Sequence, residues 1–139
     1  MGGETGVSET PVTYGITTIV DAGVDETVHA VKDALAEQGF GVITEIDLAA
    51  TLKAKLDADV PPHVILGACS PPLALRAVQA EASIGLLLPC NVVVRATKGG
   101  TIVQAIDPEL LVEVTGNREL REVAEDAAAR LRSVVASLD

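Results

Sequence analysis

The stretch that decides the fold runs from His63 to Val94 and reads HVILGACSPPLALRAVQAEASIGLLLPCNVVV. It opens with an apolar run that ends at Cys69, and a helical pattern follows after two prolines. Ser70 is of a residue type favoured at a helix N-cap, and Pro71 falls at the first helical position, where proline is tolerated. The first half of the stretch therefore predicts a strand that runs directly into a helix.

The second half of the stretch predicts another strand, over residues 86–96. Pro89 would remove a hydrogen bond from the middle of a central strand, so it indicates a sheet edge or a bulge at this point. Side chains alternate between the two faces of a strand. Cys90 therefore falls on the same face as four aliphatic residues and is expected to point into the core: Leu86, Leu88, Val92 and Val94.

Outward from this stretch, the sequence predicts an α+β fold with a mainly antiparallel sheet and helices packed on one face. We expect one domain over residues 11–139, after a polar tail of residues 1–10 that is predicted to be disordered. Alternating or β-branched runs predict the strands, and apolar residues at helical spacing predict the helices. The strands are expected over 12–20, 40–47, 63–68, 86–96 and 101–106, and the helices over 25–39, 48–56, 72–82, 107–114 and 117–138.

Charge and composition weigh against two classes of partner. Ten lysines and arginines against twenty aspartates and glutamates give a net charge of −10, which repels nucleic-acid phosphates and anionic membranes. Aromatic residues make up 1% of the chain, so surfaces for stacking bases are scarce. We expect no nucleic-acid partner and no membrane partner.

The first residues, MGGETGVSETP, carry neither a basic region nor an apolar region of the kind found in signal peptides. This predicts a cytoplasmic protein. Cysteines in that compartment are more often free thiols than disulfides, so both cysteines are expected to be thiols.

Several short motifs resemble those of the domain-of-unknown-function 302 family of bacteria and archaea. They are Gly67-Ala68-Cys69-Ser70-Pro71, Ile84-Gly85-Leu86-Leu87-Leu88-Pro89-Cys90-Asn91-Val92, Gly39-Phe40-Gly41-Val42 and Asp107-Pro108. The resemblance covers residues 14–138. It implies a fold similar to the TATA-binding-protein-like class, with a β-α-β-β-β-β-α core, and no established activity. The family motif usually has Asn where this chain has Ser70; both favour an N-cap, but a ligand contact specific to asparagine would be lost.

The strand-to-helix turn at Cys69 is the first candidate site. A thiol beside a helix start meets backbone amides and the positive end of the helix dipole, which should lower its pKa. The same amides could hold an anion. We expect a small anionic or thiol-bearing ligand to bind here, with contacts from Cys69, Ser70, Pro71, Cys90 and Asn91. Against this stands the alternative that both cysteines are buried packing residues.

The sequence leaves two other functions open and disfavours a third. If Cys69 were a nucleophile and Cys90 its resolving partner, the protein would carry out thiol redox or sulfur-transfer chemistry. A soft metal held by these cysteines and His63 is disfavoured, because the spacings match no standard ligand pattern; we expect no metal and no cofactor. A one-sided sheet with a proline-marked edge instead predicts a structural homodimer.

A pair of carboxylates is a further candidate site. Glu45 and Asp47 fall on the same face of a predicted strand, and such a pair can do acid–base work. Two solvated charges on an open sheet face are the commoner reason for this pattern. Whether the protein is an enzyme is left undecided by the sequence.

Overall fold

A five-stranded antiparallel sheet organises the protein. The structure is a computed structural model that describes residues 12–139, so the predicted tail over residues 1–10 lies outside the described residues. The strands stand in the order β1-β5-β4-β3-β2. Their bounds, with those of the helices, are β1 Gly15–Val20, α2 Val24–Glu37, β2 Gly41–Asp47, α3 Leu48–Leu56, β3 His63–Cys69, α4 Pro71–Ala80, the 3₁₀ helix η1 Ala82–Leu87, β4 Cys90–Thr97, β5 Gly100–Ile106, α5 Leu110–Thr115, the 3₁₀ helix η2 Arg118–Leu120 and α6 Arg121–Ala136.

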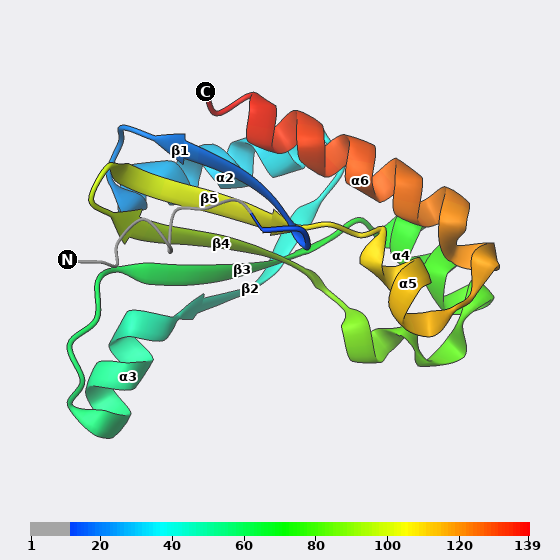
Figure 1. Cartoon of the computed structure of the whole chain (residues 1–139), viewed down its shortest axis with the longest axis horizontal. Helices are drawn as coiled ribbons and strands as arrows, with labels where there is room; N and C mark the ends of the chain where they lie inside the picture. Colours follow the sequence, from blue (N-terminus) through cyan, green and yellow to red (C-terminus); the bar gives the residue numbers. More distant parts are fainter. Residues whose placement is uncertain (1–11) are drawn as a thin grey trace.

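Helices α2 and α6 cover one face of this sheet (Figure 1). Helix α2 contacts β2, β3 and β4, while α6 contacts β1 and β5. The side chains of Leu66, Val92 and Val103 on the central strands are fully buried beneath them, as is Leu131 of α6. Burial of these aliphatic side chains makes the largest favourable contribution to packing the helices on the sheet.

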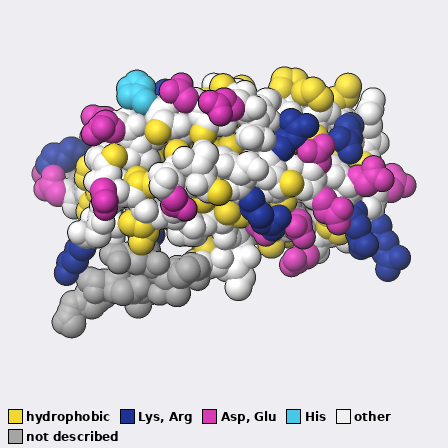
Figure 2. Space-filling view, turned by 90° about the horizontal axis from the view of Figure 1, so that it is seen from above, with side chains coloured by type: hydrophobic (Ala, Val, Ile, Leu, Met, Phe, Trp, Pro, Cys, Tyr) yellow, Lys and Arg dark blue, Asp and Glu magenta, His cyan; other side chains and the backbone are white. Residues whose placement is uncertain are grey.

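The structure confirms the predicted α+β class and the β-α-β-β-β-β-α core order. Along the chain the core elements follow as β1, α2, β2, β3, β4, β5 and α6. Helices α3, α4 and α5 are additions to this core. None of the helices formed by residues 12–139 is long and apolar enough to cross a bilayer. Seen from above, the face that carries α6 shows acidic and basic side chains interspersed, with apolar side chains between them (Figure 2).

The prediction of a strand over residues 86–96 was wrong at its start. Residues 82–87 form the 3₁₀ helix η1, the Leu88–Pro89 peptide bond is cis, and β4 begins only at Cys90. Leu86, expected to face the core, is 87% exposed. The prediction of an edge or bulge at Pro89 was also wrong, because β4 lies between β5 and β3. Pro89 precedes the first residue of that strand, a position where its missing N–H does no harm.

The bulge of this sheet lies in β2 instead. The pairing of β2 with β3 shifts between Val42 and Thr44, so Ile43 has no partner on β3. A bulge moves the following residues to the other face of the strand. Side chains alternate between the two faces before Ile43 and again after it. The faces predicted for residues 44–47 are therefore exchanged relative to those of residues 40–42.

Helix α3 is unlike the other helices in its environment. None of its residues is buried, and Figure 1 shows it projecting from the β2 edge of the sheet. Asp47 caps it by accepting a hydrogen bond of 2.9 Å from the backbone N–H of Ala50. The helix ends at Asp57, which adopts a left-handed conformation.

Candidate functional site

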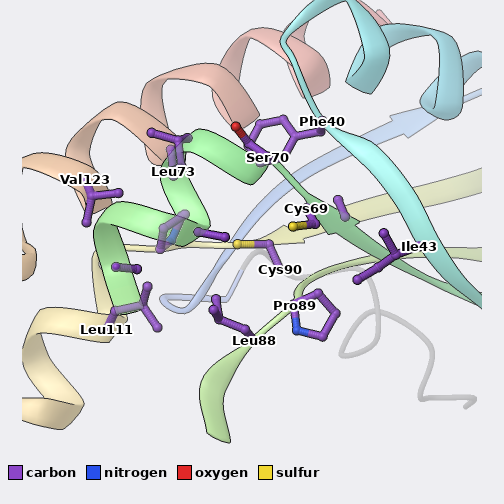
Figure 3. A pocket seen from close by; sticks show the side chains of 15 residues that line it. Phe40, Ile43, Cys69, Ser70, Leu73, Leu88, Pro89, Cys90, Leu111 and Val123 are labelled. Atoms are coloured by element: carbon purple, nitrogen blue, oxygen red, sulfur yellow. The ribbon is translucent and has the colours of Figure 1, made fainter. Parts of the chain in front are cut away.

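A pocket of about 230 Å³ lies where β3 and β4 meet the helices at one end of the sheet (Figure 3). Its walls come from β2, β3, β4, α4, α5, α6 and the connections between them. Apolar side chains dominate, and the wall contains no lysine, arginine, histidine or carboxylate. The lining residues are Phe40, Ile43, Ala68, Cys69, Ser70, Leu73, Ala74, Ala77, Leu88, Pro89, Cys90, Pro108, Leu111, Val123 and Ala127.

Both cysteines line this pocket, Cys69 as the last residue of β3 and Cys90 as the first of β4. In the register of the two strands, Cys90 is paired with Ala68, the residue before Cys69. The register therefore does not pair the two cysteines directly with each other, although both side chains reach the pocket (Figure 3). Each is a free thiol, and no disulfide joins them.

Cys90 has an unusual protonation equilibrium. Burial, and to a smaller extent the neighbouring Cys69, raise the pKa of the Cys90 thiol to about 11. A low-dielectric environment disfavours the thiolate. Cys90 is therefore a neutral thiol at physiological pH and behaves as a small apolar wall residue with a weak S–H donor.

The start of α4 offers fewer hydrogen-bond donors than most helix starts. Ser70 is the N-cap, as predicted, but its side chain makes no capping hydrogen bond. Pro71 and Pro72 occupy the first two helical positions, and proline has no N–H. The N–H of Ala74 donates to the carbonyl oxygen of Ser70 at 2.8 Å, so among the first three residues of α4 only Leu73 offers a backbone N–H. The dipole argument for an anion at this turn therefore has little donor chemistry to support it.

The predicted ligand contacts separate into two groups. Cys69, Ser70 and Cys90 lie on the pocket wall. Pro71 and Asn91 do not line it, and both are exposed. The sequence reasoning missed the apolar wall, including Phe40, Leu111 and Val123. Their only signal in the sequence was hydrophobicity at helical or strand spacing, which core residues share.

The pocket mouth is shaped by the bulge in β2. Ile43, displaced from the strand register, lines the pocket while remaining largely exposed. Opposite the bulge lies Gly67, and a Cβ atom at this position would come within 2.9 Å of Pro89 Cγ and still closer to Thr44 Oγ1. Thr44 and Pro89 can close on this part of β3 only because residue 67 has no side chain.

His63 lies too far from the cysteines to share a ligand with them. It is the first residue of β3, whereas Cys69 is the last. Six residue steps at about 3.3 Å each separate them by roughly 20 Å. Burial, and then the charge of Arg95, lower the pKa of His63. Within residues 12–139, no group of three or more His, Cys, Asp and Glu side chains is arranged to hold a metal.

Both carboxylates of the candidate acid–base pair have structural partners. Glu45 forms an ion pair with Lys32 of α2 at 2.6 Å. Asp47 caps α3. Glu45 pairs in register with Leu66, a core-facing residue, so it lies on the helix side of the sheet and not on the open face.

Comparisons with known proteins point to one family. The sequence matches DUF302, described as a domain of unknown function, over residues 16–138. The crystal structure of an uncharacterized conserved protein DUF302 from Bacillus stearothermophilus is similar to this chain with a TM-score of 0.86. The two sequences are 29% identical, and the match covers 92% of this chain and 100% of the other. None of the curated proteins matches this chain.

Proposed function

We propose that this chain, which belongs to the DUF302 family of domains of unknown function, binds a small and largely apolar ligand in the pocket between β3, β4 and α4. The observation that carries the proposal is a cavity of about 230 Å³ whose wall is almost wholly apolar. At roughly 30 Å³ for each water-sized group, this volume accommodates about seven or eight such groups. Burial of apolar surface would drive binding.

Of the two ligand classes expected from the sequence, the pocket favours the thiol-bearing one over the anionic one. No cationic side chain lines the wall, and a carboxylate or phosphate would lose its hydration without a compensating charge. Pro71 and Pro72 also remove two amide donors from the start of α4. An uncharged thiol would instead meet aliphatic carbon and the two cysteine sulfurs.

The test is a substitution on α4 that places a larger side chain in the pocket. Ala74 lines the cavity and is half-buried, so Ala74→Leu places three more carbon atoms in the ligand space. The probe is 1-hexanethiol, whose seven non-hydrogen atoms match the estimated capacity. Binding is followed by the backbone amide signals of the non-proline residues between 66 and 74 in two-dimensional NMR spectra. We expect Ala74→Leu to weaken binding at least tenfold.

Ala136→Leu is the matched control for this substitution. Ala136 is an exposed residue of α6 outside the pocket wall, and the variant should bind the probe as the wild type does. The proposal fails if the wild-type amide signals do not move at millimolar probe, or if Ala74→Leu leaves the affinity unchanged.

A thiol redox function is a second candidate, favoured by the presence of both cysteines on one pocket wall. Attack would begin at Cys69, since the pKa of Cys90 is raised to about 11 and its thiolate is rare at neutral pH. Mild peroxide should then yield a Cys69–Cys90 disulfide that a thiol reductant reverses. Intact-mass and peptide measurements that detect neither a disulfide nor a sulfenic acid would remove this candidate.

A homodimer through β2 and α3 is a third candidate. β2 is an edge strand, and a nine-residue helix with no buried residue is marginal without further contacts. Leu56 of α3 is 71% exposed. A second copy suits this surface, because an edge strand can pair antiparallel with itself and the surface carries both charge signs, with Lys53 and Lys55 near Asp57 and Asp59.

Light scattering and sedimentation velocity at micromolar concentration test the dimer. We expect twice the mass of one chain for the wild type, and the mass of a single chain for Leu56→Glu, which places a charge in the proposed interface. A wild-type protein that sediments as a monomer up to about 100 μM rejects this candidate.

A further inference from the structure

Ser70 is buried in a way that the fold itself does not explain. It is 4% exposed, it lines the pocket, and its hydroxyl group forms no hydrogen bond with any residue between 12 and 139. Buried polar side chains in folded proteins almost always have a hydrogen-bond partner, so a hydroxyl group without one requires an explanation. Leaving it unpaired costs free energy that a bound acceptor would recover.

A second unpaired donor lies beside it. The N–H of Leu73 is in the first turn of α4, where backbone amides have no acceptor within the helix. The capping side chain that would normally accept from it belongs to Ser70, and that bond is absent. No other backbone acceptor for it is found in the described part of the chain. Figure 3 shows both residues at the start of α4, with Ser70 between Phe40 and Leu73 in this view.

From these two donors we infer the chemical class of the ligand: an uncharged, mainly aliphatic molecule that carries one carbonyl oxygen. The inference rests on the proposed function of the pocket and deepens it. A carbonyl oxygen has two lone pairs and can accept from the Ser70 hydroxyl and from the Leu73 N–H together. Rotation about χ1 would turn the serine hydroxyl toward that oxygen.

The rest of the wall selects against other polar groups. A carboxylate would bring a full charge into a pocket without a cationic side chain. A purely aliphatic ligand would fill the volume but leave both donors unpaired. A ligand with one neutral acceptor is the class that satisfies the donors and keeps its remaining surface against aliphatic carbon.

The experiment compares three probes of matched size. They are 2-hexanone, its hydrocarbon isostere 2-methyl-1-hexene, and hexanoate, each titrated into the whole chain and followed by two-dimensional NMR. The ketone should bind about three- to tenfold more tightly than the alkene, which is the effect of one to two neutral hydrogen bonds, and hexanoate should bind most weakly. The amide signal of Leu73 should move most with the ketone.

The Ser70→Ala variant then tests whether Ser70 causes the preference for the ketone over the alkene. It should lower the affinity for the ketone towards that for the alkene while leaving the alkene affinity unchanged, which also shows that the variant keeps its pocket. Ser133→Ala, at an exposed position of α6, should behave as the wild type. Thermal unfolding of each variant is measured alongside.

The outcomes separate this inference from the function on which it rests. If ketone and alkene bind equally, or hexanoate binds most tightly, the assigned ligand class is wrong although the pocket still binds ligands. If Ser70→Ala keeps the full ketone preference, Ser70 is not the recognising group and the inference is overturned. If none of the three probes binds, both this inference and the proposed apolar pocket function fail.

Discussion

Cys90 should make the stability of the protein sensitive to alkaline pH. Its pKa rises from an ordinary 9.0 to about 11 in the folded protein. Because the folded state keeps this proton longer than the unfolded state does, the contribution is fully present below pH 9 and is lost as the pH rises towards 11. We expect the wild type to lose on the order of 2 kcal/mol of unfolding free energy relative to Cys90→Ala over this range.

Urea unfolding of both proteins at steps between pH 8 and pH 11 measures the difference. All other side chains are the same in both proteins, so their effects cancel in the comparison. If the two pH profiles run parallel, the Cys90 thiol does not keep its proton through folding and the prediction is wrong.

For single residues, the sequence predicted where a side chain lies better than it predicted which hydrogen bonds that side chain makes. Alternation placed Cys90 toward the core, and the structure packs it against the buried cluster. Ser70 stands at the N-cap as predicted, yet its hydroxyl makes no cap bond. A rotamer depends on the neighbours that tertiary packing supplies, so no local pattern could have revealed an unpaired hydroxyl. The two prolines that deplete the amides of α4 were readable from the sequence alone.

Any side chain at Gly67 of β3 should destabilise the protein. A Cβ atom there would meet Pro89 Cγ at 2.9 Å and would press still harder on Thr44 Oγ1. We expect Gly67→Ala to cost about 1–3 kcal/mol of unfolding free energy, the usual penalty for overpacking. Adding Thr44→Ala should recover part of that loss, because it removes the nearest obstacle and leaves Pro89 in place.

Gly85→Ala is the control for this series, since nothing lies within 4 Å of a Cβ atom at that position. Chemical denaturation of the four proteins gives the free energies. Equal stabilities of Gly67→Ala and Gly85→Ala would contradict the close contact among Thr44, Gly67 and Pro89.

Helices and strands were predicted well where the apolar residues followed a single helical or strand spacing. Helices α2, α4 and α6 were foreseen from their apolar stripes. Residues 86–89 were not, because a run of leucines fits a strand and a 3₁₀ turn equally well and Leu86 gains no burial in the fold. The bulge at Ile43 arises from pairing with β3, close to Gly67 and across from Pro89. Pro89 therefore indicated the correct region of the sheet, but the bulge lies in β2 and not in the strand that follows Pro89.

For the whole molecule, the order of elements was enough to predict the α+β class, because each helix needs a sheet face on which to bury its stripe. The pocket was not predictable in the same way. Phe40, Leu111 and Val123 come from three different parts of the chain, and only the folded topology brings them to one wall. From the sequence, each reads as an ordinary core residue.

The helix layer should lose a specific polar contact at acidic pH. Asp126 of α6 accepts a hydrogen bond of 2.7 Å from Arg130 Nε and forms an ion pair with Arg76 of α4 at 3.5 Å. Arg130 in turn donates to the carbonyl oxygen of Gln38, at the end of α2, at 3.0 Å. This chain of contacts joins three helices. The hydrogen bond from Arg130 lowers the pKa of Asp126 below its ordinary 3.8, with smaller contributions from the charges of Arg130 and Arg76.

A carboxylate whose pKa is lowered on folding stabilises the protein above its unfolded pKa and ceases to do so as the pH falls through the folded value. Asp126→Asn should therefore cost about 1 kcal/mol or less at pH 7, since the group is partly solvated, and the difference from wild type should shrink below pH 3.8. Glu125→Gln, an exposed neighbour on the same helix, should show no comparable effect at either pH. A loss for Asp126→Asn that is equally large at pH 7 and pH 2 would mean that the side chain contributes through packing and not through its charge.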